Sequence, residues 1–458
     1  MRWLRAGLVA LLLATPARVF AHGALKSSTP SSGAHIPVAP EALSLVFSES
    51  PSLTLTTLQL LGPDGSDIAL GPLTRDANSV FGVTASISGA LASGVYTVRW
   101  QMAGDDGHPT RGSFRFTLAL PATMAGTPPV TQPMEPAHEN PISQPDGAGF
   151  GVESPGYVAI RWVQYTALVI IIGAIAFAMA VLGLVQRVAG AVMVADARAR
   201  AARLALWATY LLGATAVLRL FAQSYALHGE SLAPDVALIG TLLRVTQWGH
   251  AWLLEAMAVI VALFAFRRAR DGRVVAWRVA AIAGIAVALS MALSGHAAAS
   301  PILLSLAIIA DSVHIIGAGG WLGSLLFMVL AGIPAALAVN ESLRWTTIAT
   351  LVNAFSPTAL VFSGMTAVTG VFAAWLHLES IPALWNTRYG QVLLLKLAVL
   401  SVTAAIGLYN WQRVKPILDG GPEGTRQLRR SAAVELGVGG VVLLVTAVLV
   451  ATPTGMDM

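Results

Sequence analysis

Cysteine is absent from this chain of 458 residues, and charged residues make up only 11% of it. Without cysteine, disulfide bonds, thiolate metal sites, iron–sulfur clusters and cysteine nucleophiles are all excluded. A chain with 55% hydrophobic residues and so few charges cannot cover its own surface as one water-soluble globule. The composition therefore predicts a membrane protein, in which any metal is bound by ligands other than thiolates.

The net charge of +5 is distributed unevenly. Residues 1–21 hold three arginines and no acid. Residues 22–155 hold five basic and eleven acidic residues, which gives −6, whereas residues 156–458 hold twenty basic and twelve acidic residues, which gives +8. The basic excess falls between apolar runs, as membrane topology requires. We therefore expect no nucleic-acid partner.

The sequence of the first part of the chain predicts an exported β domain. Residues 1–21 are predicted to be a signal peptide, because arginines precede an apolar run and Ala21 offers a cleavage point. Residues 22–118 contain short runs of alternating residues separated by Gly, Pro and Asp turns, which favours an all-β sandwich. The expected strands are Ala42–Phe47, Leu55–Leu60, Val80–Ile87, Val95–Trp100 and Ser113–Leu118.

A linker and an all-α membrane domain follow. Residues 119–156 contain eight prolines and are predicted to be an extended linker. Residues 157–452 contain eight apolar runs of about 20 residues, each long enough to cross a bilayer as a helix. The expected spans are 157–185, 204–227, 247–266, 276–297, 302–330, 347–376, 390–412 and 432–451.

The basic residues give these spans an orientation. With the β domain outside, the inner connections hold fifteen basic residues, whereas the outer connections hold only Arg244 and Arg388. This asymmetry follows the positive-inside rule. We therefore predict a multi-pass protein of the bacterial inner membrane, with both ends of the membrane domain and the β domain on the periplasmic side.

In this topology, all nine histidines lie outside the membrane or in its outer half. A single histidine at a helix end is an ordinary interfacial residue, but neutral imidazole is also the commonest metal ligand. The one-sided distribution favours a metal or cofactor entry site. The histidines of the membrane domain are His228, His250, His296, His314 and His377.

The fifth span carries the most specific pattern. Asp311 and His314 are three residues apart and share a helix face, and ionisable groups inside a membrane are functional candidates. The glycines that follow permit close helix approach; they are Gly317, Gly319, Gly320 and Gly323. Other ionisable residues within spans are Arg219, Glu255 and Lys396, for which a structural salt bridge is an equal alternative. Met291 is either a core residue or a copper ligand.

The β domain offers a second metal site. Cleavage after Ala21 would make His22 the mature N-terminus, whose α-amine and imidazole can chelate one ion. Asp106 and His108, in a loop between two expected strands, can present a carboxylate and an imidazole to the same ion. The resulting three nitrogens and one oxygen suit tetragonal Cu(II). The alternative is that Asp106 and His108 belong to an ordinary turn.

These stretches resemble two copper families. The segment His22–Pro30, the strand Leu45–Glu49 and the residues Tyr96–Trp100, Asp106–Pro109 and Gly112–Phe114 are similar to the periplasmic CopC family. The membrane part resembles the CopD family, with motifs at Ser294–Ala297, Asp311-Ser-Val-His314, Gly319–Gly323, Phe355–Pro357, Thr369-Gly370, Tyr389-Gly390, Lys396 and Asn410. The combination is similar to fused CopC–CopD proteins.

The resemblance implies a cupredoxin-like (Ig-like) sandwich that holds Cu(II) through His22, Asp106 and His108. It places Glu49 near a family acidic residue, as a possible outer ligand. A second Cu(I) site on a Met-rich loop is not expected, because no Met lies between Met1 and Met102. In the membrane part, the candidate path for Cu(I) or Cu(II) is His228, His250, His296, Asp311, His314 and His377.

We therefore predict a non-enzymatic protein of copper transport, homeostasis and resistance. It would bind copper ions outside, pass them to the helical domain for import, and exchange them with periplasmic copper proteins. No phosphate-binding loop for ATP is evident. Two alternatives stay open. One is a haem b membrane oxidoreductase with axial ligands among His250, His296 and His314; the other is a copper sensor or scaffold that transports nothing.

Overall fold

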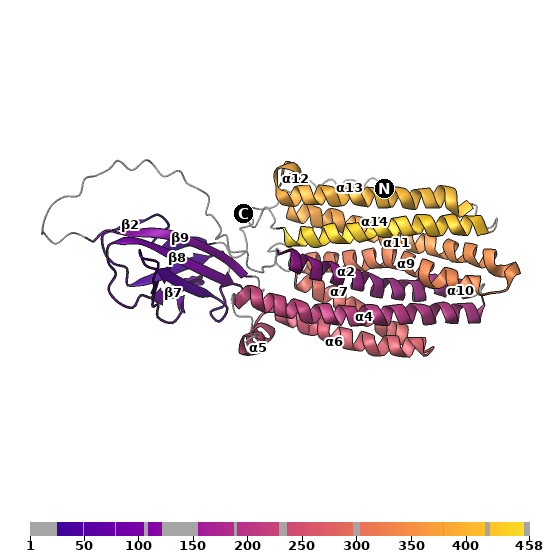
Figure 1. The fold of residues 1–458 in the computed structure, drawn as a ribbon, viewed down its shortest axis with the longest axis horizontal. Coiled ribbons are helices and arrows are strands. Elements are labelled where there is room, and N and C mark those ends of the chain that lie inside the picture. Colours follow the sequence, from indigo (N-terminus) through magenta and orange to yellow (C-terminus); the bar gives the residue numbers. More distant parts are fainter. Residues whose placement is uncertain are drawn as a thin grey trace.

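The fold is a β-sandwich at one end of a bundle of long helices (Figure 1), as the sequence predicts. The computed structural model describes residues 25–48, 50–77, 79–104, 109–120, 154–186, 190–228, 236–295, 303–378, 380–416 and 422–452.

The sandwich consists of two sheets. The first has the strand order β1 (Leu25–Thr29), β3 (Ala42–Phe47), β7 (Ser79–Ser86) and β6 (Thr74–Asp76). The second has the order β2 (His35–Ile36), β9 (Pro109–Leu118), β8 (Gly94–Ala103), β4 (Thr57–Leu61) and β5 (Asp67–Ile68). Every pair is antiparallel except β2 with β9.

Alternation along the strands builds the sandwich core. Leu43, Leu45 and Phe47 on β3 are buried, while the residues between them are partly exposed. Tyr96 on β8 stacks on Phe116 on β9 with ring centroids 5.3 Å apart. This period of two is the pattern from which the strands were predicted.

All five expected strands are present, with ends shifted by up to four residues. The strands that the sequence did not predict are β1, β2, β5 and β6. They are short, and β1 reads LKSST, with little apolar alternation. Its position depends on backbone pairing with β3, which a residue pattern does not record.

Eight helices in the described residues are long and apolar enough to cross a membrane. The first four spans are α2 (Pro155–Ala176) with η1 (Phe177–Val181) and α3 (Leu182–Val185), then α4 (Ala191–His228), α6 (Gln247–Arg270) and α7 (Val275–Leu293). The fifth span consists of α8 (Leu304–Ala318), η3 (Gly319–Gly323), α9 (Ser324–Phe327), η4 (Met328–Gly332) and α10 (Ile333–Leu337). The sixth consists of η5 (Glu341–Leu343) and α11 (Arg344–His377). The seventh is α13 (Arg388–Tyr409) with η6 (Asn410–Val414), and the eighth is α14 (Pro422–Ala451). Two shorter helices, α5 (Val236–Val245) and α12 (Ala383–Asn386), connect spans.

Several predicted span boundaries are wrong by four or more residues: the fifth span continues to Leu337 instead of 330, and the eighth begins at Pro422 instead of 432. Two others show why. Helix α4 begins at Ala191 instead of residue 204, because an Ala- and Arg-rich segment, too charged to be predicted as part of the span, still favours helix. Helix α7 ends at Leu293 instead of residue 297. The C-cap Ser294 has φ −107° and ψ 11° and leaves the helical path. His296 therefore does not end this helix, and it lies outside the described residues.

The predicted close approach of the fifth span is confirmed. Gly323 lies directly against Gly173 of α2, and a Cβ at Gly320 would overlap the ring of Phe362 on α11. A Cβ at Gly319 would similarly meet the side chain of Ile172. Small residues thus let three spans pack backbone to backbone, as is common in membrane bundles.

The bundle has two distinct ends. Consecutive spans run in alternating directions, so α4, α7, α11 and α14 end where α2, α6, α8 and α13 begin. We call this the sandwich end, because α4 meets the β domain there, and we call the opposite one the far end. The described basic clusters of the connections lie toward the far end: Arg198, Arg200, Arg203, Arg267, Arg268, Arg270, Arg273, Arg278, Arg344, Arg413, Lys415, Arg426, Arg429 and Arg430.

Candidate functional site

The four predicted metal ligands of the β domain lie outside the described residues; they are His22, Glu49, Asp106 and His108. The described strand ends next to them converge. Leu25 pairs with Phe47, and an isolated bridge joins Pro51 to Gly104. Strands β8 and β9 stay paired as far as Ala103 and Pro109. The chain therefore leaves the sandwich toward all four residues from the same end.

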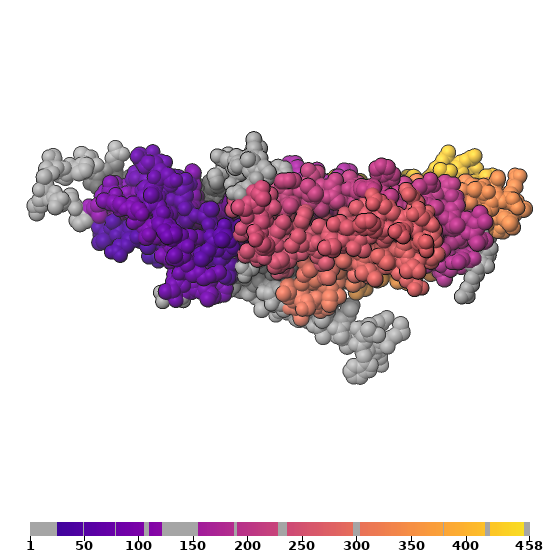
Figure 2. All heavy atoms as spheres, turned by 90° about the horizontal axis from the view of Figure 1, so that it is seen from below, coloured from indigo at the N-terminus to yellow at the C-terminus, as the bar shows by residue number. Residues whose placement is uncertain are grey.

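That end of the sandwich is docked on the helical bundle. Leu55 and Ala103 of the sandwich share a buried apolar cluster with Leu227 and Trp248 of α4 and α6. In Figures 1 and 2 the sandwich, in indigo and purple, abuts the helices near α5. The predicted ligand segments thus depart from the side of the sandwich that meets the membrane domain.

Polar contacts at this docking surface cap a helix. The amide Nε2 of Gln101 donates to the carbonyl oxygen of Leu227, and Nη2 of Arg111 donates to that of Ala226 at 2.5 Å. Both carbonyls belong to the last turn of α4, where carbonyl groups lack intrahelical partners and the helix dipole favours a cation. The sandwich therefore supplies the C-terminal cap of α4.

A buried ion pair lies beneath the docking surface. Nη1 of Arg219 on α4 is 3.7 Å from Oε2 of Glu255 on α6. Glu255 is fully buried and Arg219 is 5% exposed. Arg219 lies nine residues before the end of α4, roughly 13 Å along the helix axis. Taking two charges out of water is costly, so their retention in a membrane span marks a functional candidate.

Neighbouring side chains complete this centre. Nε2 of Gln164 on α2 donates to Oε1 of Glu255 at 2.6 Å. Arg219 donates to the hydroxyl of Ser294 at 3.0 Å and to the thioether of Met291 at 3.5 Å. We call Gln164, Arg219, Glu255, Met291 and Ser294 the buried centre; it joins α2, α4, α6 and the end of α7. Among the described residues, Met291 therefore serves as an acceptor for Arg219.

Trp248 connects the buried centre to the docking surface. Cζ of Arg219 lies 5.1 Å from the centroid of the Trp248 ring, within cation–π range. The same tryptophan packs in the cluster that holds Leu55 and Ala103 of the sandwich. Trp248 thus lies beside the charged groups and belongs to the apolar cluster at which the sandwich docks.

The second candidate region surrounds His314, which is half-buried on α8. Its Nδ1 lies 3.1 Å from the hydroxyl of Thr369 on α11, and Gly370 leaves room for the imidazole ring. Asp311, one turn earlier, interacts electrostatically with Lys396 of α13. The CopD-like motifs that contain Asp311, His314, Thr369 and Lys396 therefore meet in space. The hydroxyl of Thr369 is a hydrogen-bond partner of the His314 imidazole.

The remaining predicted histidines lie at helix ends. His228 is the last residue of α4, and His377 is the last of α11, where its ring packs edge-on to Tyr389 at 6.3 Å. Nε2 of His250, near the start of α6, lies 3.0 Å from the carbonyl oxygen of Arg244. Among the described residues no three His, Asp or Glu side chains gather as a metal cluster. The membrane copper path therefore stays a prediction.

Sequence reasoning missed two polar contacts. Gln164 lies inside the most apolar span, and its role in holding Glu255 was not predicted. Glu435 on α14 is buried and accepts a hydrogen bond from Nδ2 of Asn410 at 3.1 Å. A lone polar residue within an apolar run was the available signal in both cases. The partner of each could not be read from the sequence.

The fold defines a class: a multi-pass helical membrane protein with a β-sandwich docked on one end. Family models extend this description. The CopC domain matches residues 25–119, the N-terminal domain of copper resistance protein D-like proteins matches 152–303, and copper resistance protein D matches 349–449.

Individual proteins are similar to this chain over different lengths. The copper transport protein CutJ of Bacillus subtilis is 24% identical over 456 residues, 98% of this chain and 77% of that protein. Protein YobA of Escherichia coli K12 is 32% identical over 106 residues, 23% of this chain and 85% of that protein. The crystal structure of PcoC, a methionine-rich copper resistance protein from E. coli, is similar over 21% of this chain and 99% of that chain, at 28% identity and a TM-score of 0.20.

The chain belongs to the family of copper resistance and copper transport proteins that combine CopC and CopD domains. This confirms the family predicted from the sequence and its association with copper.

Proposed function

We propose that the sandwich captures Cu(II) through His22, Asp106 and His108, with Glu49 as an outer ligand. The domain then passes copper to the helical bundle for import. In this proposal the protein lies in the bacterial inner membrane, with the sandwich on the periplasmic side and periplasmic copper proteins as donors or acceptors. The helices α8 and α11, which carry His314 and Thr369, form part of the route.

One observation carries the proposal. The sandwich end from which the chain leaves toward the predicted ligands is the end docked on α4 and α6. A metal released there would face the bundle and not bulk solvent. The basic far end supports the orientation, because connections rich in Lys and Arg stay in the cytoplasm.

The first step is tested by Cu(II) binding to the full-length protein in detergent. His22→Ala and His108→Ala are each expected to weaken Cu(II) binding strongly, since each removes an imidazole ligand. His35→Ala is the matched control, because His35 lies exposed on β2 of the same domain. Unchanged binding in both ligand variants would contradict the proposed site.

The transport step is tested in proteoliposomes loaded with a copper-sensitive dye. Copper added on the sandwich side is expected to enter with the wild type and to enter slowly with His314→Ala. Binding without any flux would instead identify a sensor or scaffold. A Soret band in the purified protein would identify a haem protein.

A further inference from the structure

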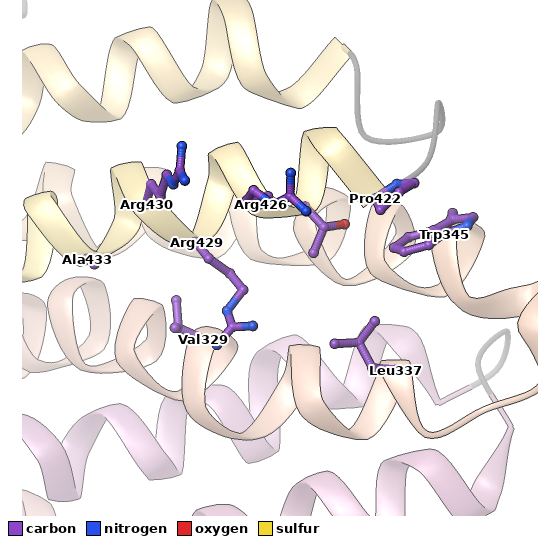
Figure 3. A pocket seen from close by; sticks show the side chains of 9 residues that line it. Val329, Leu337, Trp345, Pro422, Arg426, Arg429, Arg430 and Ala433 are labelled. Carbon is purple, nitrogen blue, oxygen red and sulfur yellow. The ribbon is translucent and has the colours of Figure 1, made fainter.

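A cavity of about 530 Å³ opens at the far end of the bundle, and none of the candidate copper ligands that the structure describes lines it. Its walls come from the start of α14, from the start of α11 and from the segment η4–α10. In Figure 3, Arg429 extends from α14 toward Val329 on the facing segment, and Trp345 and Leu337 close the other side. The cavity thus joins cationic and apolar walls.

Two of the three arginines that line the cavity have no acidic partner among the residues that the structure describes. Arg426 is 3.1 Å from Glu423, and both side chains are exposed. In the described part of the chain, no carboxylate lies within salt-bridge distance of Arg429 or Arg430. Their guanidinium groups therefore have donors available for an anion.

A buried hydroxyl points to a ligand independently of these charges. Thr425 lines the cavity and is only 5% exposed, yet its Oγ1 makes no hydrogen bond to any described residue. Buried polar atoms without a partner are rare in folded proteins. Thr425 also lies in the first turn of the 30-residue helix α14, where backbone N–H groups lack intrahelical acceptors and favour anions.

The apolar residues that line the cavity indicate which kind of anion it binds. Val329, Leu337, Trp345 and Ala433 would contact a hydrocarbon group and gain nothing from inorganic phosphate. The cavity lies at the end of membrane spans, the depth at which lipid headgroups meet basic side chains. A molecule with a phosphate and an attached apolar tail would bind the arginines through its phosphate and pack its tail against the apolar residues.

We propose that this cavity binds the headgroup of an anionic phospholipid. The phosphate takes the hydroxyl of Thr425, the guanidinium of Arg429 and the first amides of α14. Trp345 and Leu337 pack against the glycerol and the beginning of the acyl chains. This site is separate from the proposed copper ligands. A result that contradicts lipid binding here would therefore leave the proposed copper function untouched, and the reverse also holds.

The test is native mass spectrometry of the full-length protein with phosphatidylglycerol or phosphatidylcholine of identical acyl chains. The wild type is expected to retain phosphatidylglycerol preferentially. Arg429→Gln is expected to weaken this binding about fivefold, the effect of one arginine near a membrane surface. Thr425→Val, a substitution of similar shape, is expected to weaken it without removing charge.

Arg268→Gln is the matched control, because Arg268 is an exposed far-end arginine that does not line the cavity. It is expected to leave retention unchanged. Equal losses in Arg268→Gln and Arg429→Gln would indicate general surface attraction and overturn the proposal. Displacement of the lipid by millimolar inorganic phosphate, or retention of phosphatidylcholine to the same extent, would overturn the lipid assignment.

Discussion

Arg219 and Glu255 near the sandwich end of the bundle are buried and paired, whereas Arg429 and Arg430 at the far end are exposed and have no acidic partner among the described residues. Arg219 and Glu255 are enclosed by four helices, while Arg429 and Arg430 stand at an open cavity. Burial makes an unpaired charge prohibitive, so the first pair must be complete within the protein. Exposure imposes no such cost, so the far-end arginines are free to bind groups outside the chain.

The comparison also separates two ways of holding a membrane protein together. At the sandwich end, hydrogen bonds link helices to one another and to the docked domain through Gln164, Arg219 and Arg111. At the far end, in the proposed orientation, the basic residues keep the connections on the cytoplasmic side. Removing one charge or one hydrogen bond at a time tests this difference between the sandwich end and the far end.

The largest effect is expected at the buried ion pair. Glu255→Ala leaves the Arg219 guanidinium buried without its carboxylate and is expected to cost about 3–5 kcal/mol of stability. Thermal unfolding in detergent measures this. Asp196→Ala is the control, because the pair Asp196–Arg200 is about one-third exposed and such pairs contribute about 0–1 kcal/mol. Equal losses in the two variants would contradict the distinction between buried and exposed pairs.

A smaller loss of free energy is expected when a hydrogen bond between the sandwich and α4 is removed. Arg111→Ala removes a charged hydrogen bond to the end of α4, which contributes about 1.5–3 kcal/mol. The sandwich should then undock more often, which a spin-label or fluorescence distance between the sandwich and α5 would record. Arg115→Ala, at an exposed position on the same strand β9, should leave the distance distribution unchanged.

A still smaller effect on stability is expected at His314. Thr369→Val removes the hydrogen bond to Nδ1 and is expected to cost about 1 kcal/mol. If His314 lies on the copper route, flux should fall by more than this change in stability explains. Thr350→Val, on the same helix and hydrogen-bonded only to a backbone carbonyl of its own helix among the described residues, is the control.

The smallest effect is expected at the far end. Arg429→Gln should change the free energy of unfolding by less than about 0.5 kcal/mol, since it removes an exposed charge that has no acidic partner in the described part of the chain. Thermal unfolding in lipid-free detergent checks this. A loss as large as that of Glu255→Ala would remove the contrast between the two ends.

Local patterns were enough to predict much of this molecule. The alternation of Leu43, Leu45 and Phe47 predicted β3, and the cluster of glycines at positions 319, 320 and 323 predicted close helix packing. Boundaries were less accurate where the local pattern was ambiguous. The charged, alanine-rich start of α4 and the early end of α7 at Ser294 are two examples.

The sequence by itself determined the two-part architecture, the eight spans and the uneven distribution of basic residues. Each of these depends on hydrophobic periodicity, run length or local charge, which neighbouring residues define. Only the tertiary structure decided which polar groups meet. The pairing of Gln164 with Glu255, of Thr369 with His314 and of Arg111 with α4 depends on helix rotation and domain docking. Those are set by packing between segments up to 115 residues apart, which no local pattern records.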